Sequence, residues 1–198
     1  MDEASFKAGI YEVRWHGRGG QGAITAAQIL AEAAHLQGYL GVTAAPSFGA
    51  ERRGVPVSAL TRISREPIRV YSQAVTPDVV VVLDHSLLKD AQVTGGLKPD
   101  GCLVVNTWLP PGELGLDKNV RVVTADATKV CRDLGLVMGG SLIVSTAILG
   151  AFARASDVVQ LSSFERAVRA RFSDSASTHN LKAMRMTYEI TSANDVKR

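Results

Sequence analysis

The spacing of apolar residues predicts alternating strands and helices over the first two thirds of the chain. Tyr11–His16 alternates apolar and polar residues, as a strand with one buried face does, and Ala23–Gln37 has apolar residues at helical spacing. Asp78–Asp84 is apolar at every inner position, which is typical of a strand with helices over both faces, so we expect it at the centre of a parallel sheet. Further short strands are expected at Tyr39–Thr43, Cys102–Asn106 and Val120–Thr124.

The remaining pattern predicts one hairpin and several helices. Val55–Ile63 and Ile68–Tyr71 are predicted as strands joined by a turn short enough to make them antiparallel neighbours. Helices are expected over Ser86–Val93, Asp126–Leu134, Ser141–Arg154, Ser162–Phe172 and His179–Ile190. The predicted fold is therefore α/β: an open, mostly parallel, Rossmann-like sheet with an inserted antiparallel hairpin and a helical C-terminal third.

The simplest division of the chain is one α/β domain over residues 1–172. Residues 173–198 are expected to form a C-terminal helical tail that packs on the domain or on a partner. The polar run Ser173–Thr178 marks the place where we expect packed structure to give way to extended chain.

Composition indicates a folded globular domain and excludes a disordered or collagen-like chain. The 198 residues are 46% hydrophobic and 21% charged, and 22 Lys and Arg against 19 Asp and Glu give a net charge of +3, too small to indicate nucleic-acid binding. No apolar stretch reaches the ~20 residues that span a membrane, and we expect a cytoplasmic protein. Cys102 and Cys131 lack the spacing of a metal site or a disulfide framework.

A glycine-rich turn is the first candidate binding site. Gly17-Arg18-Gly19-Gly20-Gln21-Gly22 matches G-x-G-x-x-G and lies between a predicted strand and a predicted helix. Glycine lets the backbone approach an anion, and the free amides at the start of the helix supply donors and partial positive charge. The alternative is that these glycines serve only a tight turn and close packing of helix on strand.

Two departures from known nucleotide-binding motifs reduce the range of ligands expected at this turn. No acidic residue follows at about 20 residues beyond the glycines, where a dinucleotide site holds the ribose. Gly22 is followed by Ala23 rather than by the lysine and hydroxyl residue of a P-loop. The sequence therefore disfavours NAD binding and ATP hydrolysis.

A loop with paired arginines is the second candidate. In Pro46–Gly54, Arg52 and Arg53 are adjacent and Glu51 precedes them. Guanidinium groups suit phosphate or carboxylate recognition, and the loop would complete an anion site with Arg18. The alternative is a surface loop whose arginines contact a neighbouring subunit.

Other polar residues have structural interpretations. His16 is expected to be a structural hydrogen-bonding residue, Ser141 a helix cap, and Asp84, at the carboxyl end of its strand, the cap of the next helix. We predict no catalytic residue and no metal ligand in this chain.

Several segments together resemble one known family. Trp15–Gly22 with Thr25–Ala27, Phe48–Gly54, Arg62–Ser64, Pro77–Asp84, Gly139-Gly140 and Thr146–Ala151 are similar to the gamma subunit of 2-oxoacid oxidoreductases, the family of pyruvate:ferredoxin oxidoreductase. The resemblance covers the chain to about residue 170. Many relatives have Asn-Thr where this chain has Ser145-Thr146.

The resemblance implies a subunit of a larger enzyme of anaerobic metabolism. Such a complex oxidatively decarboxylates a 2-oxoacid to an acyl-CoA and passes two electrons to ferredoxin or another acceptor. Alpha and beta subunits would hold thiamine diphosphate and Mg²⁺, a ferredoxin-like delta subunit would hold iron–sulfur clusters, and this gamma subunit would help bind coenzyme A and close the active site. The residues expected to contact coenzyme A or a partner are Gly17, Arg18, Gly19, Gly20, Gln21, Gly22, Glu51, Arg52 and Arg53.

Two other interpretations remain open from the sequence. One is a stand-alone Rossmann-type oxidoreductase that uses a nicotinamide or a flavin. The other is a purely structural subunit without ligand contact. Neither the 2-oxoacid nor the electron acceptor is specified by the sequence.

Overall fold

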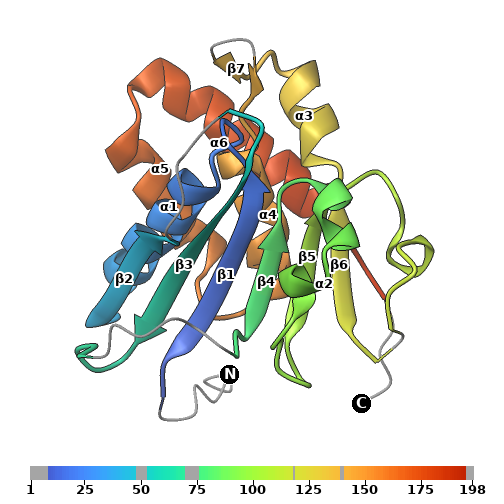
Figure 1. Ribbon diagram of the computed structural model, residues 1–198. Coiled ribbons are helices and arrows are strands. Elements are labelled where there is room, and N and C mark those ends of the chain that lie inside the picture. Colours follow the sequence, from blue (N-terminus) through green and yellow to red (C-terminus); the bar gives the residue numbers. More distant parts are fainter. Residues whose placement is uncertain (1–8, 48–52, 70–75, 118, 139–140, 195–198) are drawn as a thin grey trace.

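A seven-stranded sheet forms the centre of the computed structural model (Figure 1), which describes residues 9–47, 53–69, 76–117, 119–138 and 141–194. The strands are β1 (Tyr11–Arg18), β2 (Gly41–Pro46), β3 (Pro56–Ser64), β4 (Val79–Val82), β5 (Cys102–Asn106), β6 (Arg121–Ala125), β7 (Val137–Met138), β8 (Ser141–Leu142) and β9 (Ser192–Ala193). The α-helices are α1 (Ala23–Leu36), α2 (Ala91–Thr94), α3 (Ala127–Asp133), α4 (Ser145–Ala155), α5 (Leu161–Arg171) and α6 (Asp174–Ile190), with 3₁₀ turns η1 (His85–Lys89) and η2 (Pro111–Glu113).

The sheet order is β2-β3-β1-β4-β5-β6-β9, with a parallel centre and antiparallel flanks. β1, β4, β5 and β6 run parallel, whereas β3 is antiparallel to β1 and to β2, and β9 is antiparallel to β6. All four residues of β4 are buried, as a strand with both faces covered requires. The predicted α/β class and the central position of this strand are confirmed.

Helices cover the two faces of the sheet unequally. α1, α4, α5 and α6 lie behind the sheet in Figure 1 and share the main apolar core, in which Trp15 contacts Phe152 and Phe152 contacts Phe164. On the opposite face, η1 and α2 pack Leu87 and Val93 over β4 and β5 in a smaller core. Among the described residues, no helix has the length and apolar character needed to cross a bilayer.

The antiparallel pair lies elsewhere than predicted. β3 is paired with β2 on one side and with β1 on the other. Because both edges of β3 are occupied, no place remains beside it for the strand predicted over Ile68–Tyr71. Ile68 and Arg69 belong to no strand, and Val70 and Tyr71 lie outside the described residues.

The helix predicted over Ser141–Arg154 begins four residues later, at Ser145. Ser141–Leu142 instead forms β8, which pairs with β7, so the prediction of Ser141 as a helix cap is wrong. The pairing continues through the Ile143 amide, which donates to the Leu136 carbonyl at 3.2 Å. Leu142-Ile143-Val144 includes two β-branched residues, which favour extended backbone.

The polar run Ser173–Thr178 is helical rather than extended. α6 begins at Asp174, and the Ser177 hydroxyl is buried and donates to the carbonyls of Val168 and Phe172. α6 packs along α4 so closely that a Cβ at Gly150 would lie 2.0 Å from the Met184 carbonyl oxygen. The predicted extended segment is therefore wrong, because side-chain hydrogen bonds and helix packing outweigh its polarity.

Candidate anion site at the glycine turn

The glycine turn joins the end of β1 to the start of α1. Gly20 and Gly22 have φ of 95° and 87°, left-handed values that glycine adopts at little cost. Gln21 stabilises the turn through two hydrogen bonds. Its side-chain Oε1 accepts from the Arg18 backbone amide at 2.7 Å, and its backbone amide donates to the Arg18 carbonyl at 3.0 Å. The turn is therefore held in one conformation by its own residues.

Two of the glycines also permit close packing. A Cβ at Gly17 would lie 3.2 Å from the Ala23 Cβ and 3.4 Å from the Leu83 Cβ. A Cβ at Gly22 would lie 2.8 Å from the Ser145 Cβ, so the N-termini of α1 and α4 meet there. The packing role that the sequence left open is thus present at Gly17 and Gly22.

The N-termini of α1 and α4 lack side-chain caps where they meet. α1 has no acidic residue in its first turn, and neither α1 nor α4 has a side-chain cap hydrogen bond. The Ser145 hydroxyl is buried and has no hydrogen-bonding partner within the described part of the chain. Free amides at the positive end of a helix dipole favour negative charge, so this junction has both hydrogen-bond donors and a positive electrostatic potential.

Arg18 makes three hydrogen bonds, two toward η1 and one to the arginine loop. Its Nε donates to Asp84 Oδ2 at 2.8 Å, its Nη2 to Ser86 Oγ at 2.9 Å, and its Nη1 to the Gly54 carbonyl at 3.2 Å. The charge of Arg18 is therefore balanced by Asp84.

Asp84 is the cap of η1, as the sequence analysis expected. Its Oδ1 accepts hydrogen bonds from the Ser86 amide at 3.0 Å and from the Ser86 hydroxyl at 2.6 Å. Burial raises the pKa of Asp84, but the hydrogen bonds from Ser86 and Arg18 outweigh burial, and the net pKa is below the ordinary value. The helix predicted over Ser86–Val93 is divided into η1 and α2.

The described part of the arginine loop lies against the glycine turn. The Gly19 amide donates to the Val55 carbonyl at 2.8 Å, and the Gly54 amide donates to the Gly19 carbonyl at 3.0 Å. Arg53 pairs with Gly19 in a single β-bridge and is exposed. The structure thus brings Arg53 beside the turn, whereas Glu51 and Arg52 lie outside the described residues.

A hollow of about 480 Å³ lies next to this junction, on the face of the sheet that carries η1. We call it the β1–η1 hollow; its lining residues are His16, Ser47, Pro56, Val57, Ser58, Ser86, Leu87, Lys89, Asp90, Gln92 and Val93. Ser86, which lines the hollow, also bonds to Arg18, so the hollow lies beside the glycine turn although no residue of Gly17–Gly22 lines it. The sequence analysis missed the hollow, since its walls come from four separate segments with no shared motif.

His16 contributes a neutral imidazole to the hollow. Burial, and to a lesser extent the charge of Arg14, lower the pKa of His16 to about 4. His16 Nε2 is buried and has no hydrogen-bonding partner among the described residues. The structural hydrogen bond expected of His16 is therefore not made by Nε2 within the described residues.

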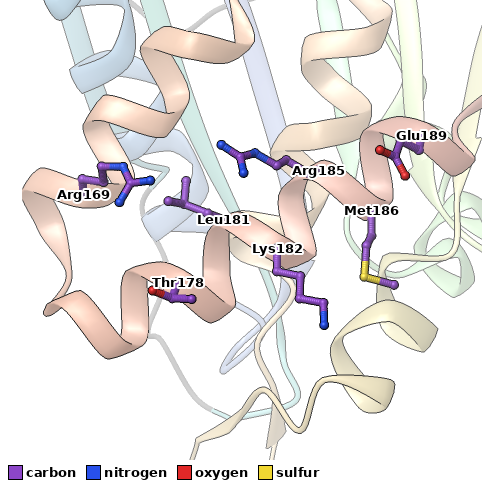
Figure 2. Close-up of a pocket in the computed structure, with 7 residues that line it drawn as sticks. All are labelled: Arg169, Thr178, Leu181, Lys182, Arg185, Met186 and Glu189. Carbon is purple, nitrogen blue, oxygen red and sulfur yellow. The ribbon is translucent and has the colours of Figure 1, made fainter.

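A second hollow, of about 260 Å³, lies between α5 and α6 (Figure 2). Its lining residues are Arg169, Thr178, Leu181, Lys182, Arg185, Met186 and Glu189. Arg185 Nε donates to Glu165 Oε1 at 2.6 Å, and this bond lowers the pKa of Glu165 and raises that of Arg185. The helices that form this hollow cover the opposite face of the sheet from η1, so it is separate from the glycine-turn site.

The described residues contain no group of three side chains able to hold a metal ion. Cys102 and Cys131 are buried free thiols, and burial raises their pKa to about 11 and about 12. His85 packs edge-on against Trp108 at 4.6 Å between ring centroids.

The fold and the site define a class: an open α/β sheet with a glycine-rich turn at the carboxyl end of its strands, where such sheets bind ligands. Comparison with known proteins gives the family, because the model of the pyruvate ferredoxin/flavodoxin oxidoreductase family matches residues 12–190. The gamma subunit common to pyruvate and ketoisovalerate oxidoreductases of Pyrococcus abyssi is 49% identical over 187 residues, which cover 92% of this chain and 97% of that protein.

Solved structures agree with this assignment. Pyruvate oxidoreductase subunit PORC from Thermotoga maritima has a TM-score of 0.80 and 34% identity, with 94% of this chain and 99% of that one covered. A 2-oxoglutarate:ferredoxin oxidoreductase from Magnetococcus marinus, solved with 2-oxoglutarate, coenzyme A and succinyl-CoA, shares the fold at a TM-score of 0.71 and 18% identity, over 93% of this chain and 31% of that one. The chain belongs to the pyruvate ferredoxin/flavodoxin oxidoreductase family, and the predicted resemblance to its gamma subunits is confirmed.

Proposed function

We propose that this chain is the gamma subunit of a thiamine diphosphate-dependent complex that converts a 2-oxoacid and coenzyme A into an acyl-CoA and CO₂. The reaction breaks the bond between the carboxylate and the oxo carbon and forms a thioester to the coenzyme A sulfur. It releases one proton and two electrons, which pass to ferredoxin or another acceptor. The role of this chain is to bind part of coenzyme A and to close the active site.

The junction of the glycine turn, the Arg53–Gly54 segment and the two helix N-termini carries this proposal. Coenzyme A bears a diphosphate and a further phosphate. The amides of Arg18, Gly19 and Gln21 are bonded within the protein, so the groups proposed to bind it are the first-turn amides of α1 and α4, with their helix dipoles, and Arg53. Arg18 and Gln21 fix the conformation of the turn through their hydrogen bonds. Glu51 and Arg52 are proposed to act beside Arg53.

Coenzyme A contact is assigned to this chain, and the redox chemistry to its partners. When bound in the complex, thiamine diphosphate would supply the carbanion that attacks the oxo carbon, and iron–sulfur clusters would carry the electrons. Cluster ligation needs cysteine thiolates, whereas burial keeps Cys102 and Cys131 protonated. The proposed partners are therefore alpha and beta subunits for thiamine diphosphate and Mg²⁺, and a ferredoxin-like delta subunit.

The proposed compartment is the cytoplasm. Cys102 and Cys131 are free thiols, the form that a reducing compartment maintains.

Reconstitution of the complex tests the proposed function. The purified chain alone should show no turnover, and adding it to the alpha, beta and delta subunits should restore coenzyme A-dependent oxidation of a 2-oxoacid, followed by reduction of ferredoxin. Turnover of a hydroxy acid with NAD by the isolated chain would instead establish a stand-alone dehydrogenase.

Charge reversal distinguishes ligand binding from a purely structural role. The double variant Arg52→Glu/Arg53→Glu should raise the KM for coenzyme A in the assembled complex, with Arg132→Glu on the exposed side of α3 as the matched control. If assembly fails while the KM of the remaining complex is unchanged, the arginines serve the subunit interface.

A further inference from the structure

The hollow between α5 and α6 has an apolar floor and a charged rim (Figure 2). Leu181 is buried at 3% exposure and Met186 is half-buried, so both lie below the surface of the helices. Arg169 of α5 and Lys182 and Arg185 of α6 surround them, and all three cations are exposed. We call the hollow of Figure 2 the α5–α6 groove.

The cations of the groove exceed the carboxylate that balances them. Arg185 Nε donates to Glu165 Oε1 at 2.6 Å, and this bond and, at longer range, the charge of Arg169 lower the pKa of Glu165, so one carboxylate faces two guanidinium groups. Lys182 makes no hydrogen bond or ion pair with any residue in the described part of the chain. The unbalanced positive charge favours an acidic partner.

The charged groups are spread along the groove rather than gathered at one point. Thr178 and Glu189 lie at opposite ends of the face of α6 that lines it, and a rise of ~1.5 Å per residue puts them about 16 Å apart along the helix axis. Lys182 and Glu189 lie about two turns apart on the same face. A small anion would leave most of the groove uncovered, whereas a segment of polypeptide would contact its whole length.

The apolar floor indicates that the occupant has an apolar side chain that protrudes into the groove. Leu181 lies below the charged rim, so it is not placed to insert into a lipid bilayer, but an aliphatic or aromatic side chain of another protein would contact both Leu181 and Met186. An apolar anchor inside a polar rim is typical of protein–protein interfaces, and an amphipathic helix laid in a groove is a common form of it.

We propose that the α5–α6 groove docks an acidic amphipathic helix of another subunit of the same enzyme complex. Carboxylates of that helix would contact Arg169 and Lys182, and one of its apolar side chains would contact Leu181. A Lys or Arg about two turns from the carboxylates would contact Glu189. This inference rests on the proposed function, because it takes the chain to be one subunit of a complex. None of the described residues that line the groove belongs to the glycine turn, so the groove should affect assembly and not coenzyme A binding.

Charge reversal at the rim tests the docking. Arg169→Glu/Lys182→Glu should raise the Kd of this chain for the other subunits by about tenfold or more, because two attractive contacts become repulsive. The matched control is Lys129→Glu/Arg132→Glu, which makes the same change of charge at exposed positions of α3. Isothermal titration calorimetry measures the Kd, and circular dichroism checks that both variants fold. The Kd of the parent chain should rise with salt more steeply than that of the rim variant.

A bulky side chain tests the shape of the groove without changing its charge. Thr178 is exposed and lines the groove, so Thr178→Trp should fill it and raise the same Kd, whereas Thr178→Ser should not. In the complex that still assembles, both variants should keep the parent KM for coenzyme A.

Cross-linking of amines to carboxylates identifies the occupant. Treating the assembled complex with a carbodiimide should join Lys182 Nζ through an amide bond to an Asp or Glu of another subunit, which mass spectrometry locates. Exchanging that acidic residue for Lys should then restore the assembly lost in Lys182→Glu.

Failure of the docking and failure of the proposed function are distinguishable. If the other subunits turn over equally well without this chain, the proposed function is wrong. If they need the chain, but Arg169→Glu/Lys182→Glu binds them as tightly as the α3 control does, only the docking is overturned. A Lys182 cross-link confined to a second copy of this chain or to the free electron acceptor would overturn it as well, as would a raised KM for coenzyme A with unaltered assembly.

Discussion

Substituting Gly22 with alanine tests the contact between the N-termini of α1 and α4. Gly22 has φ of 87°, and an L-residue in left-handed backbone costs ~1–2 kcal/mol. The new Cβ would also lie 2.8 Å from the Ser145 Cβ, an overlap of the kind that costs ~1–3 kcal/mol. We therefore expect Gly22→Ala to lower the free energy of unfolding by ~2–5 kcal/mol.

The control for this substitution is Gly38→Ala. Gly38 also has a positive φ, 106°, but a Cβ there would meet no described atom within 4 Å, so only the backbone cost applies. Urea unfolding of the purified chain, followed by circular dichroism, measures both variants. The reasoning is refuted if Gly22→Ala costs no more than Gly38→Ala, and it is strengthened if adding Ser145→Gly recovers the excess loss.

Three further predictions follow from the structure. Gly150→Ala should lower the free energy of unfolding by more than ~2 kcal/mol, measured in urea, because its Cβ would lie 2.0 Å from the Met184 carbonyl oxygen. Asp84→Asn should cost ~1 kcal/mol at pH 7, and the difference from the parent should shrink as pH falls below the unfolded-state pKa of ~3.9, because the net pKa of Asp84 is lowered in the folded state. The pKa of His16 is lowered to about 4 in the folded chain, so the unfolded chain binds more protons between that value and ~6.5. The free energy of unfolding should therefore decrease as the pH is lowered through this window, and the decrease should be smaller in His16→Gln. NMR titration of His16 should give a midpoint near 4.

The local sequence pattern was sufficient to predict secondary structure where neighbouring residues determine it. β5 spans Cys102–Asn106 as predicted, because a short apolar run with two adjacent valines, preceded by the turn-forming Pro99-Asp100-Gly101, favours a buried strand. The strand-turn-helix context of the glycine motif was also predicted correctly, since Gly20 and Gly22 adopt the left-handed backbone that the motif needs. In these cases the information lies within a few neighbouring residues.

The sequence pattern gave wrong predictions where contacts between distant residues override local conformational preference. The Ser173–Thr178 run is polar enough to suggest extended chain, yet Ser177 is buried and bonds to carbonyls of the preceding segment. The partners of Arg18 were equally inaccessible to sequence reasoning, since Asp84 and Ser86 lie 66 and 68 residues away. The β1–η1 hollow depends on both kinds of information, because its walls meet only after the strands pair.

The location of the candidate site follows from how the chain leaves two adjacent parallel strands. After β1 the chain turns to α1, on the face of the main core, whereas after β4 it turns to η1, on the opposite face. Divergent connections leave a crevice at the carboxyl ends of the two strands, the point at which open α/β sheets bind ligands. The Arg18–Asp84 ion pair spans this point and joins the two connections, which places the glycine turn beside the β1–η1 hollow.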